Sequence, residues 1–282
     1  MAVLLCELAI ACGESEADGA PATTEGAPGD ASDETSAGST DTSSGDGESD
    51  GTTSSDSDLP SPPTNLDETV AIYGAAWNEH DEDRRRALLE LAWADDGFYR
   101  DPTVVAQGRD ALVEAIGAFH ASFPGSELEI VGAIDAYDAQ LRFAWTITGT
   151  AALPGEDIGE IGDDLRLTAI TGFFGPLPSG TPIPDPVAAL VDAWAEEDAA
   201  TRALLLDAAV TDDFVLRQPG LEIADREALD EHMAAGAMTL DGTPDAYGPV
   251  MRFGVSTSDG DGLAMATVAD DGRLSALTMF FD

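Results

Sequence analysis

Tyr99 and Asp101, two residues apart, are the first side chains in the sequence whose types and spacing suggest chemistry. They lie in DGFYRDP, which predicts a strand that ends at Pro102. Because side chains alternate along a strand, both point to one face, and Asp101 could act as a general base if it is shielded from water there. An aspartate before proline also caps turns, so a structural role for Asp101 remains the alternative.

His120 is a second candidate, because a histidine near the end of a helix can move protons close to neutral pH. The helix predicted around it is GRDALVEAIGAFHASF, and packing of the ring against the helix end is the alternative role. The chain has three histidines and two cysteines, both before residue 13, and none has metal-ligand spacing. We therefore expect no metal and no cofactor.

A repeated pattern must supply the elements that position these residues. RLTAITGFFG at residues 166–175 returns as RLSALTMFFD at residues 273–282. Before this segment, the same residue types recur at a spacing of 117. Examples are Trp77 and Trp194, Asp81 and Asp198, and Arg109 and Arg226. The offset falls to 107 at Arg273, so the second copy lacks ten residues, and we expect most of the loss around TAALPGEDIGEIG. The repeat predicts two tandem domains, residues 63–178 and 186–282.

Each copy has the same expected order of elements. Apolar residues at helical spacing predict a first helix, and Asp81 or Asp198 is placed to cap a second. A strand, a third helix and β-rich segments follow, whereas GEDIGEIGDD lacks strand alternation and is interpreted as a loop. The predicted class is α+β, with a curved, mainly antiparallel sheet wrapped on three helices in each domain.

This order resembles the nuclear transport factor 2-like superfamily, particularly its SnoaL-like branch. The segments that carry the resemblance are AWNEHD, YRDP, GRDAL, FHASFPG and TGFFG. It covers nearly all of residues 66–176 and, more faintly, residues 187–282. The resemblance implies cone-shaped domains with a hydrophobic pocket, which polyketide cyclases, steroid isomerases and dehydratases use, as do domains that only bind or associate.

The resemblance to the steroid isomerases also implies roles for single residues. Asp101 would be the general base, Tyr73 on the first helix would hold an enolate oxygen, and a protonated Asp157 would be the second donor. His120 resembles the polyketide-cyclase branch as an alternative acid or base, and Tyr99 and Trp145 are expected to bind ligand. The second copy is expected to be degenerate, because Tyr73, Tyr99, Asp101, His120 and Asp157 become Leu190, Leu216, Gln218, Ala237 and Ala264.

The first 62 residues differ in composition from the rest. Ala9 to Cys12 resemble a bacterial lipobox, which predicts a signal segment at residues 1–12 and lipid attachment at Cys12. Residues 13–62 consist largely of Gly, Ser, Thr, Asp and Glu, which predicts a disordered acidic tether. We therefore expect an extracytoplasmic bacterial membrane lipoprotein, with a secreted or cytoplasmic protein as the alternative.

Charge limits the partners. The chain carries a net charge of -43, and removing the 14 acidic residues of its first 62 positions leaves about -29. Such a field repels phosphate, so nucleic acid is excluded and membrane contact is expected only through the lipid.

The leading hypothesis for function is that the first domain binds a small hydrophobic molecule. The alternatives are an isomerase, cyclase or dehydratase with Asp101 as base, and a non-catalytic assembly module. The two domains are expected to pair as an intrachain pseudo-dimer, or the chain as a homodimer.

Overall fold

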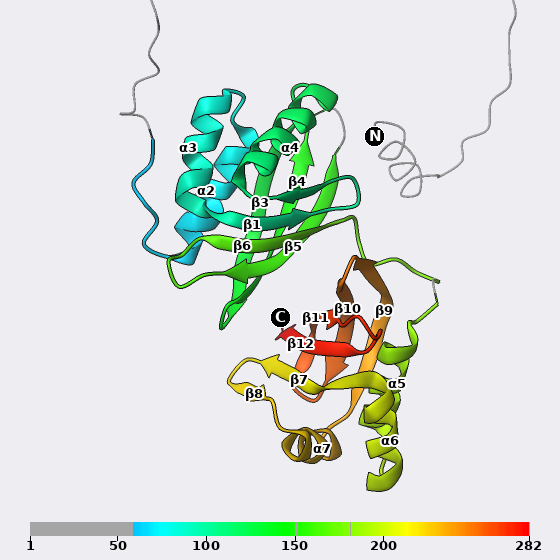
Figure 1. Ribbon diagram of the computed structural model, residues 1–282. Helices are drawn as coiled ribbons and strands as arrows, with labels where there is room; N and C mark the ends of the chain where they lie inside the picture. Colours follow the sequence, from blue (N-terminus) through cyan, green and yellow to red (C-terminus); the bar gives the residue numbers. More distant parts are fainter. Residues whose placement is uncertain (1–58, 150–151, 181, 282) are drawn as a thin grey trace, which may run out of the picture.

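The computed structural model describes residues 59–149, 152–180 and 182–281 (Figure 1). The predicted signal segment, Cys12 and nearly all of the predicted tether lie outside these residues. Within the described ranges, no helix is long and apolar enough to cross a membrane.

The predicted α+β fold, with two tandem domains of three helices each, is confirmed. The first domain consists of α2 (Leu66–Asn78), α3 (Glu82–Ala92), β1 (Trp93–Arg100), β2 (Val105–Gln107), α4 (Arg109–Ser122), β3 (Glu127–Tyr137), β4 (Gln140–Thr148), β5 (Leu153–Ile161) and β6 (Leu167–Phe174). The second consists of α5 (Asp185–Ala195), α6 (Ala199–Ala209), β7 (Val210–Gln218), β8 (Leu221–Ile223), α7 (Arg226–Ala234), β9 (Met238–Tyr247), β10 (Val250–Thr257), β11 (Gly260–Val268) and β12 (Leu274–Phe281).

Both sheets have the same topology. Their strand orders are β2-β1-β6-β5-β4-β3 and β8-β7-β12-β11-β10-β9. Among the described strands, one pair in each sheet is parallel, β1 with β6 and β7 with β12, and the others are antiparallel. Helices cover the inner face of each sheet (Figure 1). The main core of each domain lies between these two layers and is built from aliphatic and aromatic side chains of both.

The second helix of each domain begins at the predicted cap. The Asp81 carboxylate accepts a hydrogen bond of 2.9 Å from the Arg84 backbone N–H, and Asp198 accepts one of 2.9 Å from that of Thr201. Each cap satisfies a backbone donor that the first helical turn leaves without a partner. The repeated aspartate therefore fixes where the second helix starts in both copies.

The interpretation of GEDIGEIGDD as a loop is wrong, because most of it lies in β5, between β4 and β6. Alternation is missing because glycines occupy positions where neighbours approach closely. A Cβ on Gly155 would lie 2.2 Å from the Trp145 ring, and one on Gly159 would lie 2.0 Å from the Ala169 carbonyl oxygen. The strand therefore needs glycines that weaken its sequence signal.

The expected position of the ten-residue loss is also mostly wrong. Trp145 pairs with Ile130 and Gly155, and in the second domain Val255 pairs with Leu240 and Gly262. Equivalent residues of the two domains are thus 110 positions apart in β3 and β4 and 107 apart in β5. In the helix before them, α4, they are 117 apart, as Arg109 and Arg226 show. Seven residues are missing between the third helix and β9, and three in the turn between β10 and β11. With an offset of 110, Ala237 corresponds to Glu127, so it is not equivalent to His120 as predicted.

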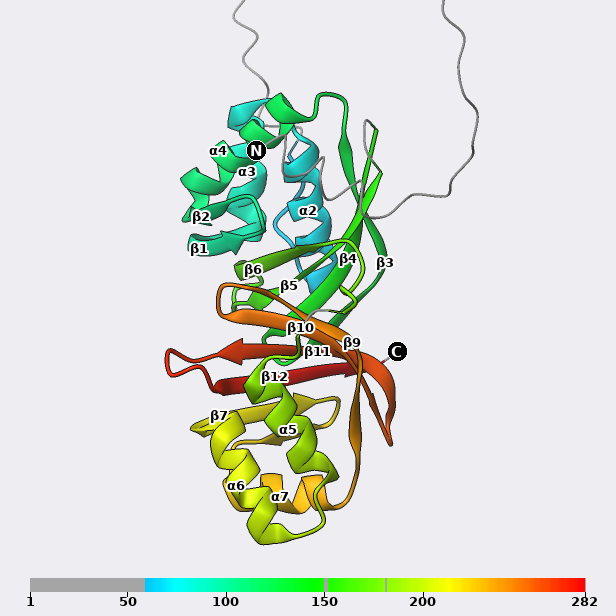
Figure 2. The same cartoon turned by 90° about the vertical axis from the view of Figure 1, so that its right-hand side faces the viewer.

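The two sheets face each other in the middle of the molecule, with α2 to α4 and α5 to α7 toward opposite ends (Figure 2). A buried cluster joins Ile158 and Phe173 to Leu263, Met265 and Phe280. The other domain therefore covers at least the part of each sheet's outer face that carries these residues.

Candidate functional site

Five of the predicted site residues lie together inside the first domain. Tyr73 comes from α2, Tyr99 from β1, Asp101 from the residue after β1, Trp145 from β4 and Asp157 from β5. The Tyr99 hydroxyl donates to Asp101 Oδ2 at 2.9 Å, and Trp145 Nε1 donates to Asp157 Oδ1 at 2.8 Å. The Tyr73 hydroxyl lies 3.4 Å from Asp157 Oδ2. Two carboxyl groups, each with aromatic donors, thus form one polar cluster in the core.

The structure shows the turn-capping role considered for Asp101. Its Oδ1 accepts hydrogen bonds from the Thr103 backbone N–H at 2.6 Å, the Thr103 hydroxyl at 2.7 Å and the Val104 N–H at 2.8 Å. This oxygen caps the turn after Pro102. Oδ2 faces Tyr99, so Asp101 is a turn cap that also presents one oxygen to the cluster.

Asp157 is the group in the cluster that titrates near neutral pH. Burial raises its pKa from 3.8 to about 7, the nearby Asp101 charge adds to the rise, and the hydrogen bonds from Trp145 and Tyr73 oppose it. Burial also raises the pKa of Tyr73 and of Tyr99 well above 10, and the charges of Asp157 and Asp101 add to both shifts. The two phenols therefore stay neutral donors.

His120 lies apart from this cluster. Its ring packs 4.1 Å from the ring of His80, centroid to centroid, at the end of α4. Burial lowers the pKa of His120, and the neighbouring His80 and Arg85 lower it further. Among the described residues, no hydrogen bond or ring contact joins His120 to Asp101 or Asp157. The structure therefore does not bring His120 to the other predicted residues.

The cluster is shielded from solvent. Tyr73 is 0 % exposed, Tyr99, Trp145 and Asp157 are 3 % exposed, and Asp101 is 8 % exposed. Within the described parts of the chain, no ion pair includes either carboxylate, and no group of three His, Cys, Asp or Glu side chains is arranged to hold a metal. The arrangement offers two carboxyls and three neutral donors for proton transfer in a dry environment.

Comparison with known proteins identifies the fold family. No family model and no curated protein match the chain. A candidate isomerase of the SnoaL-like family from Agrobacterium tumefaciens is 30 % identical over 39 % of this chain and 96 % of its own, with a TM-score of 0.37. The chain belongs to the SnoaL-like family. Each of its two domains is about the length of that protein.

Two further SnoaL-like or cyclase structures are more distant. A candidate SnoaL-like polyketide cyclase from Jannaschia is 12 % identical over 42 % of this chain and 90 % of its own, with a TM-score of 0.35. A candidate polyketide cyclase from Sinorhizobium meliloti is 16 % identical over 41 % of this chain and 96 % of its own, with a TM-score of 0.32.

Gly172 borders the buried cluster, and sequence reasoning missed it. A Cβ at Gly172 would lie 3.0 Å from Asp157 Oδ1, 3.3 Å from the Tyr99 hydroxyl and 3.4 Å from Asp101 Cβ. The two halves of the cluster therefore meet over a position on β6 that has no side chain. The signal was present in the repeat, because the counterpart of Gly172 is Met279, which is fully buried in the second domain.

Proposed function

We propose that the first domain binds a small apolar molecule that carries a ketone and moves a proton on the carbon next to that ketone, as an isomerase, cyclase or dehydratase does. The observation that supports this most is Asp157, a fully buried carboxyl with a pKa of about 7 beside a second buried carboxyl. Buried carboxyls without a cationic partner cost stability and cluster at functional sites.

The second domain provides an internal control for this argument. It folds with the same topology, and Leu190, Leu216, Ala264 and Met279 take the places of Tyr73, Tyr99, Asp157 and Gly172. All four replacements are apolar and fully buried. The fold therefore does not require the polar cluster, which favours a chemical role for it.

The proposed reaction gives each side chain of the cluster a role. Asp101 Oδ2 takes a proton from the substrate carbon, and the electrons of the broken C–H bond move onto the carbonyl oxygen. Protonated Asp157 and the Tyr73 hydroxyl donate hydrogen bonds to the resulting enolate oxygen. Trp145 Nε1 holds Asp157 in position, and Tyr99 does the same for Asp101. Return of the proton to another carbon completes an isomerisation.

The proposed activity should depend on pH. Because the donor form of Asp157 is the protonated one, turnover should fall as pH rises through about 7, the pKa of this carboxyl. The rate of Asp157→Asn, whose amide stays a donor at all pH values, should lose this decline. A pH profile of the reaction measured from pH 5 to pH 9 checks the result.

Solvent exchange tests the proposal without knowing the natural substrate. The full chain is incubated in D₂O with steroid-like and polyketide-like ketones, and NMR follows deuterium at the carbon next to the carbonyl. Asp101→Asn should lower the exchange rate by about a hundredfold or more, in the range of one acid or base group. Asp213→Asn, an exposed aspartate in the second domain, is the matched control. Undiminished exchange in Asp101→Asn excludes the proposed base.

Binding without turnover is the second candidate function. It is favoured by the closed cluster, in which no residue is more than 8 % exposed and Asp101 Oδ1 already accepts three hydrogen bonds. Native mass spectrometry with bacterial lipid extract and the same ketones separates the candidates. An adduct that Asp101→Asn weakens, without deuterium exchange, identifies a binding domain; absence of adduct and exchange supports an assembly module.

Lipid attachment at Cys12 is a further part of the proposal and rests on the sequence alone. The Ala9 to Cys12 segment and the acidic stretch that follows support an extracytoplasmic lipoprotein. Labelling with an alkyne fatty acid in a bacterial host should modify the full chain and Cys6→Ser, but not Cys12→Ser. Labelling of Cys12→Ser at the level of the unaltered chain would exclude this site.

A further inference from the structure

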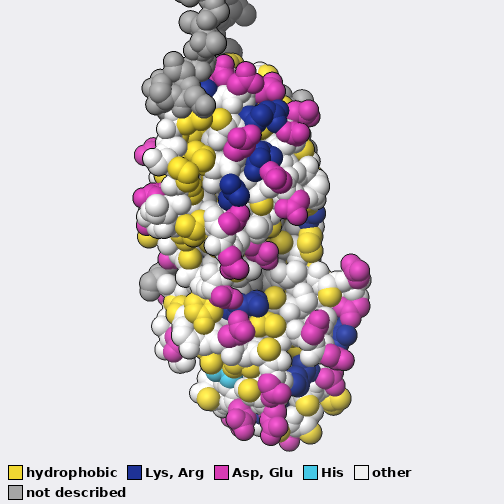
Figure 3. All heavy atoms as spheres, turned by 60° about the vertical axis from the view of Figure 1, so that its left-hand side comes forward, with side chains coloured by type: hydrophobic (Ala, Val, Ile, Leu, Met, Phe, Trp, Pro, Cys, Tyr) yellow, Lys and Arg dark blue, Asp and Glu magenta, His cyan; other side chains and the backbone are white. Residues whose placement is uncertain are grey.

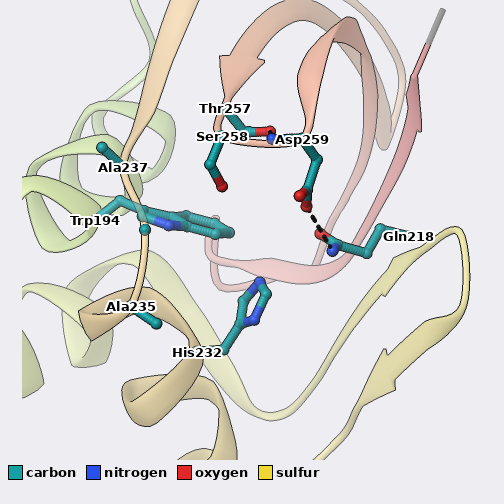
Figure 4. A pocket seen from close by; sticks show the side chains of 9 residues that line it. Trp194, Gln218, His232, Ala235, Ala237, Thr257, Ser258 and Asp259 are labelled. Atoms are coloured by element: carbon teal, nitrogen blue, oxygen red, sulfur yellow. Dashed lines mark hydrogen bonds between the residues drawn. The ribbon is translucent and has the colours of Figure 1, made fainter.

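The second domain contains a pocket of about 160 Å³ between α5, α7 and the turn that joins β10 to β11 (Figure 4). Trp194 and His232 lie on the helical side, and Ser258 and Asp259 lie on the turn. A cavity of roughly 150 Å³ holds a molecule the size of benzene. The pocket therefore suits a ligand much smaller than a drug-sized molecule.

The pocket exists because the second domain is shortened at the end of its third helix. In the first domain α4 has 14 residues, and its Phe119 packs against Trp77 with ring centroids 5.7 Å apart. In the second domain α7 has 9 residues, and Trp194 replaces Trp77. The missing stretch is the one that carries Phe119 and Phe123, so the space beside Trp194 is left open.

Small residues complete the opening. Ala235, Gly236 and Ala237 follow α7 and line the pocket. A Cβ at Gly236 would lie 3.8 Å from Ser258 Oγ and 4.0 Å from Trp194 Nε1, which are ordinary contact distances. A side chain at this position would begin beside Trp194 and Ser258, which both line the pocket.

The lining combines one carboxylate with aromatic rings. Gln218 Nε2 donates to Asp259 Oδ2 at 3.3 Å, and no ion pair of the described residues includes Asp259. The His232 ring meets the Trp194 ring edge to face, with centroids 5.9 Å apart. Figure 4 shows Asp259 and Gln218 on one side of the space and the two rings on the other. The lining thus offers a cation a carboxylate on one side and an indole on the other.

The surface charge favours the same sign of ligand. The chain carries 55 acidic and 12 basic residues, and acidic side chains spread over both domains on the face shown in Figure 3. Such a field concentrates cations near the protein and repels anions. We propose that the pocket binds a small organic cation, with its ammonium group between Asp259 and Trp194. This proposal is independent of the chemistry proposed for the first domain.

The test titrates the full chain with benzylammonium and tetramethylammonium, and with benzyl alcohol and tert-butanol as neutral counterparts of similar size. NMR follows the indole N–H of Trp194, which is assigned through Trp194→Phe. The cations should shift this signal saturably and bind about tenfold or more tightly than the neutral molecules. Equal binding of the neutral counterparts, or no saturable shift with any probe, overturns the proposal.

Two variants locate the site. Asp259→Asn should weaken cation binding about tenfold, whereas Asp261→Asn, on the same hairpin but outside the pocket, should leave it unchanged. Gly236→Phe should abolish binding by filling the space beside Trp194, and its melting temperature shows whether it folds. Equal losses in Asp259→Asn and Asp261→Asn would mean diffuse charge attraction and contradict a pocket. Asp259→Asn changes an exposed side chain, so the test holds even if Gly236→Phe does not fold.

Discussion

Asp101 and Asp157, the two carboxyl groups of the buried cluster, differ in their hydrogen-bond partners. Asp101 accepts four hydrogen bonds, three of them on the oxygen that caps a turn. Among the residues that the structure describes, Asp157 accepts hydrogen bonds only from Trp145 and Tyr73. Hydrogen bonds from donors favour the charged form of a carboxyl, and Asp157, with fewer of them and with burial raising its pKa to about 7, keeps its proton more readily. Asp157 is therefore the carboxyl suited to donate, and Asp101 the one suited to accept.

The Asp157 proton should make stability depend on pH. Its pKa is about 7 in the folded chain and 3.8 in the absence of burial, so the folded state holds this proton more tightly. Its stabilising contribution is complete below pH 3.8 and is lost as pH rises through about 7, by on the order of 4 kcal/mol in total. Urea unfolding of Asp157→Asn at pH 5 and pH 8 should show a much smaller difference than the unaltered chain. Glu160→Gln, an exposed change on the same strand, should keep the original slope.

Single residues show what the sequence could and could not predict about the site. Alternation placed Tyr99 beside Asp101, and the family resemblance added Tyr73 and Asp157, all of which lie in one cluster. His120 was grouped with them because the sequence does not show where the end of a helix lies relative to a sheet. Gly172 was missed because a glycine takes part through the space it leaves, although comparison with Met279 in the repeat carried that information.

At the scale of elements, β5 depends on glycines that its neighbours require. The Trp145 ring lies over Gly155, and the same ring donates to Asp157 two residues further along the strand. Packing of one strand and orientation of the carboxyl are thus one arrangement. A side chain at Gly155 would have to displace the ring or the strand.

Gly155→Ala should test this arrangement. Its methyl group would lie 2.2 Å from the Trp145 ring and 2.7 Å from the Phe173 carbonyl oxygen, so we expect a loss of about 1–3 kcal/mol in the free energy of unfolding. Gly162→Ala is the control, because its nearest neighbour is a side-chain oxygen of Asp164 at 3.1 Å. Denaturant unfolding followed by tryptophan fluorescence measures both. Equal effects of the two changes would mean that the ring adjusts freely.

Helices were easier to predict than the middle of the sheet. Asp81 and Asp198 mark helix starts by a local hydrogen bond, which the sequence records directly. The lengths of α4 and α7 differ by five residues, and only strand pairing shows that most of the missing residues belong there. Strand register depends on residues far apart in the chain. Comparing the two copies along the sequence alone therefore could not show where the second domain lacks its ten residues.

At the scale of the whole molecule, Arg252 joins the two domains. From β10 it donates to Glu156 at 3.3 Å and to the Gly175 carbonyl oxygen at 2.9 Å, and it lies 4.7 Å from the centre of the Phe173 ring. Burial raises the pKa of Glu156, and the charge of Arg252 counteracts this rise. These contacts support the proposal that the domains form an intrachain pseudo-dimer. Sedimentation analysis should then find the chain monomeric.

Replacement of Arg252 should uncouple the domains. Its side chain is 4 % exposed and that of Glu156 is 16 % exposed, so Arg252→Met leaves a buried carboxylate with one cationic neighbour fewer. We expect a loss of about 3 kcal/mol and a separation of the two domains' unfolding transitions in calorimetry. Arg217→Met, whose partner Glu222 is 50 % exposed, should cost less than about 1 kcal/mol. Unchanged transitions in Arg252→Met would show that the apolar cluster alone couples the domains.

Because the chain is synthesised from its N-terminus, the first sheet is finished before the strands that cover its outer face have been made. The first sheet is complete at Phe174, but the side chains that cover its outer face include Phe280 on β12. At roughly 5–20 residues per second, a ribosome needs about 5–20 s to add the intervening stretch. During that interval Ile158 and Phe173 face water on a finished sheet. A nascent chain halted between the two domains should therefore bind chaperones that recognise exposed apolar surface, and release them once β12 has emerged.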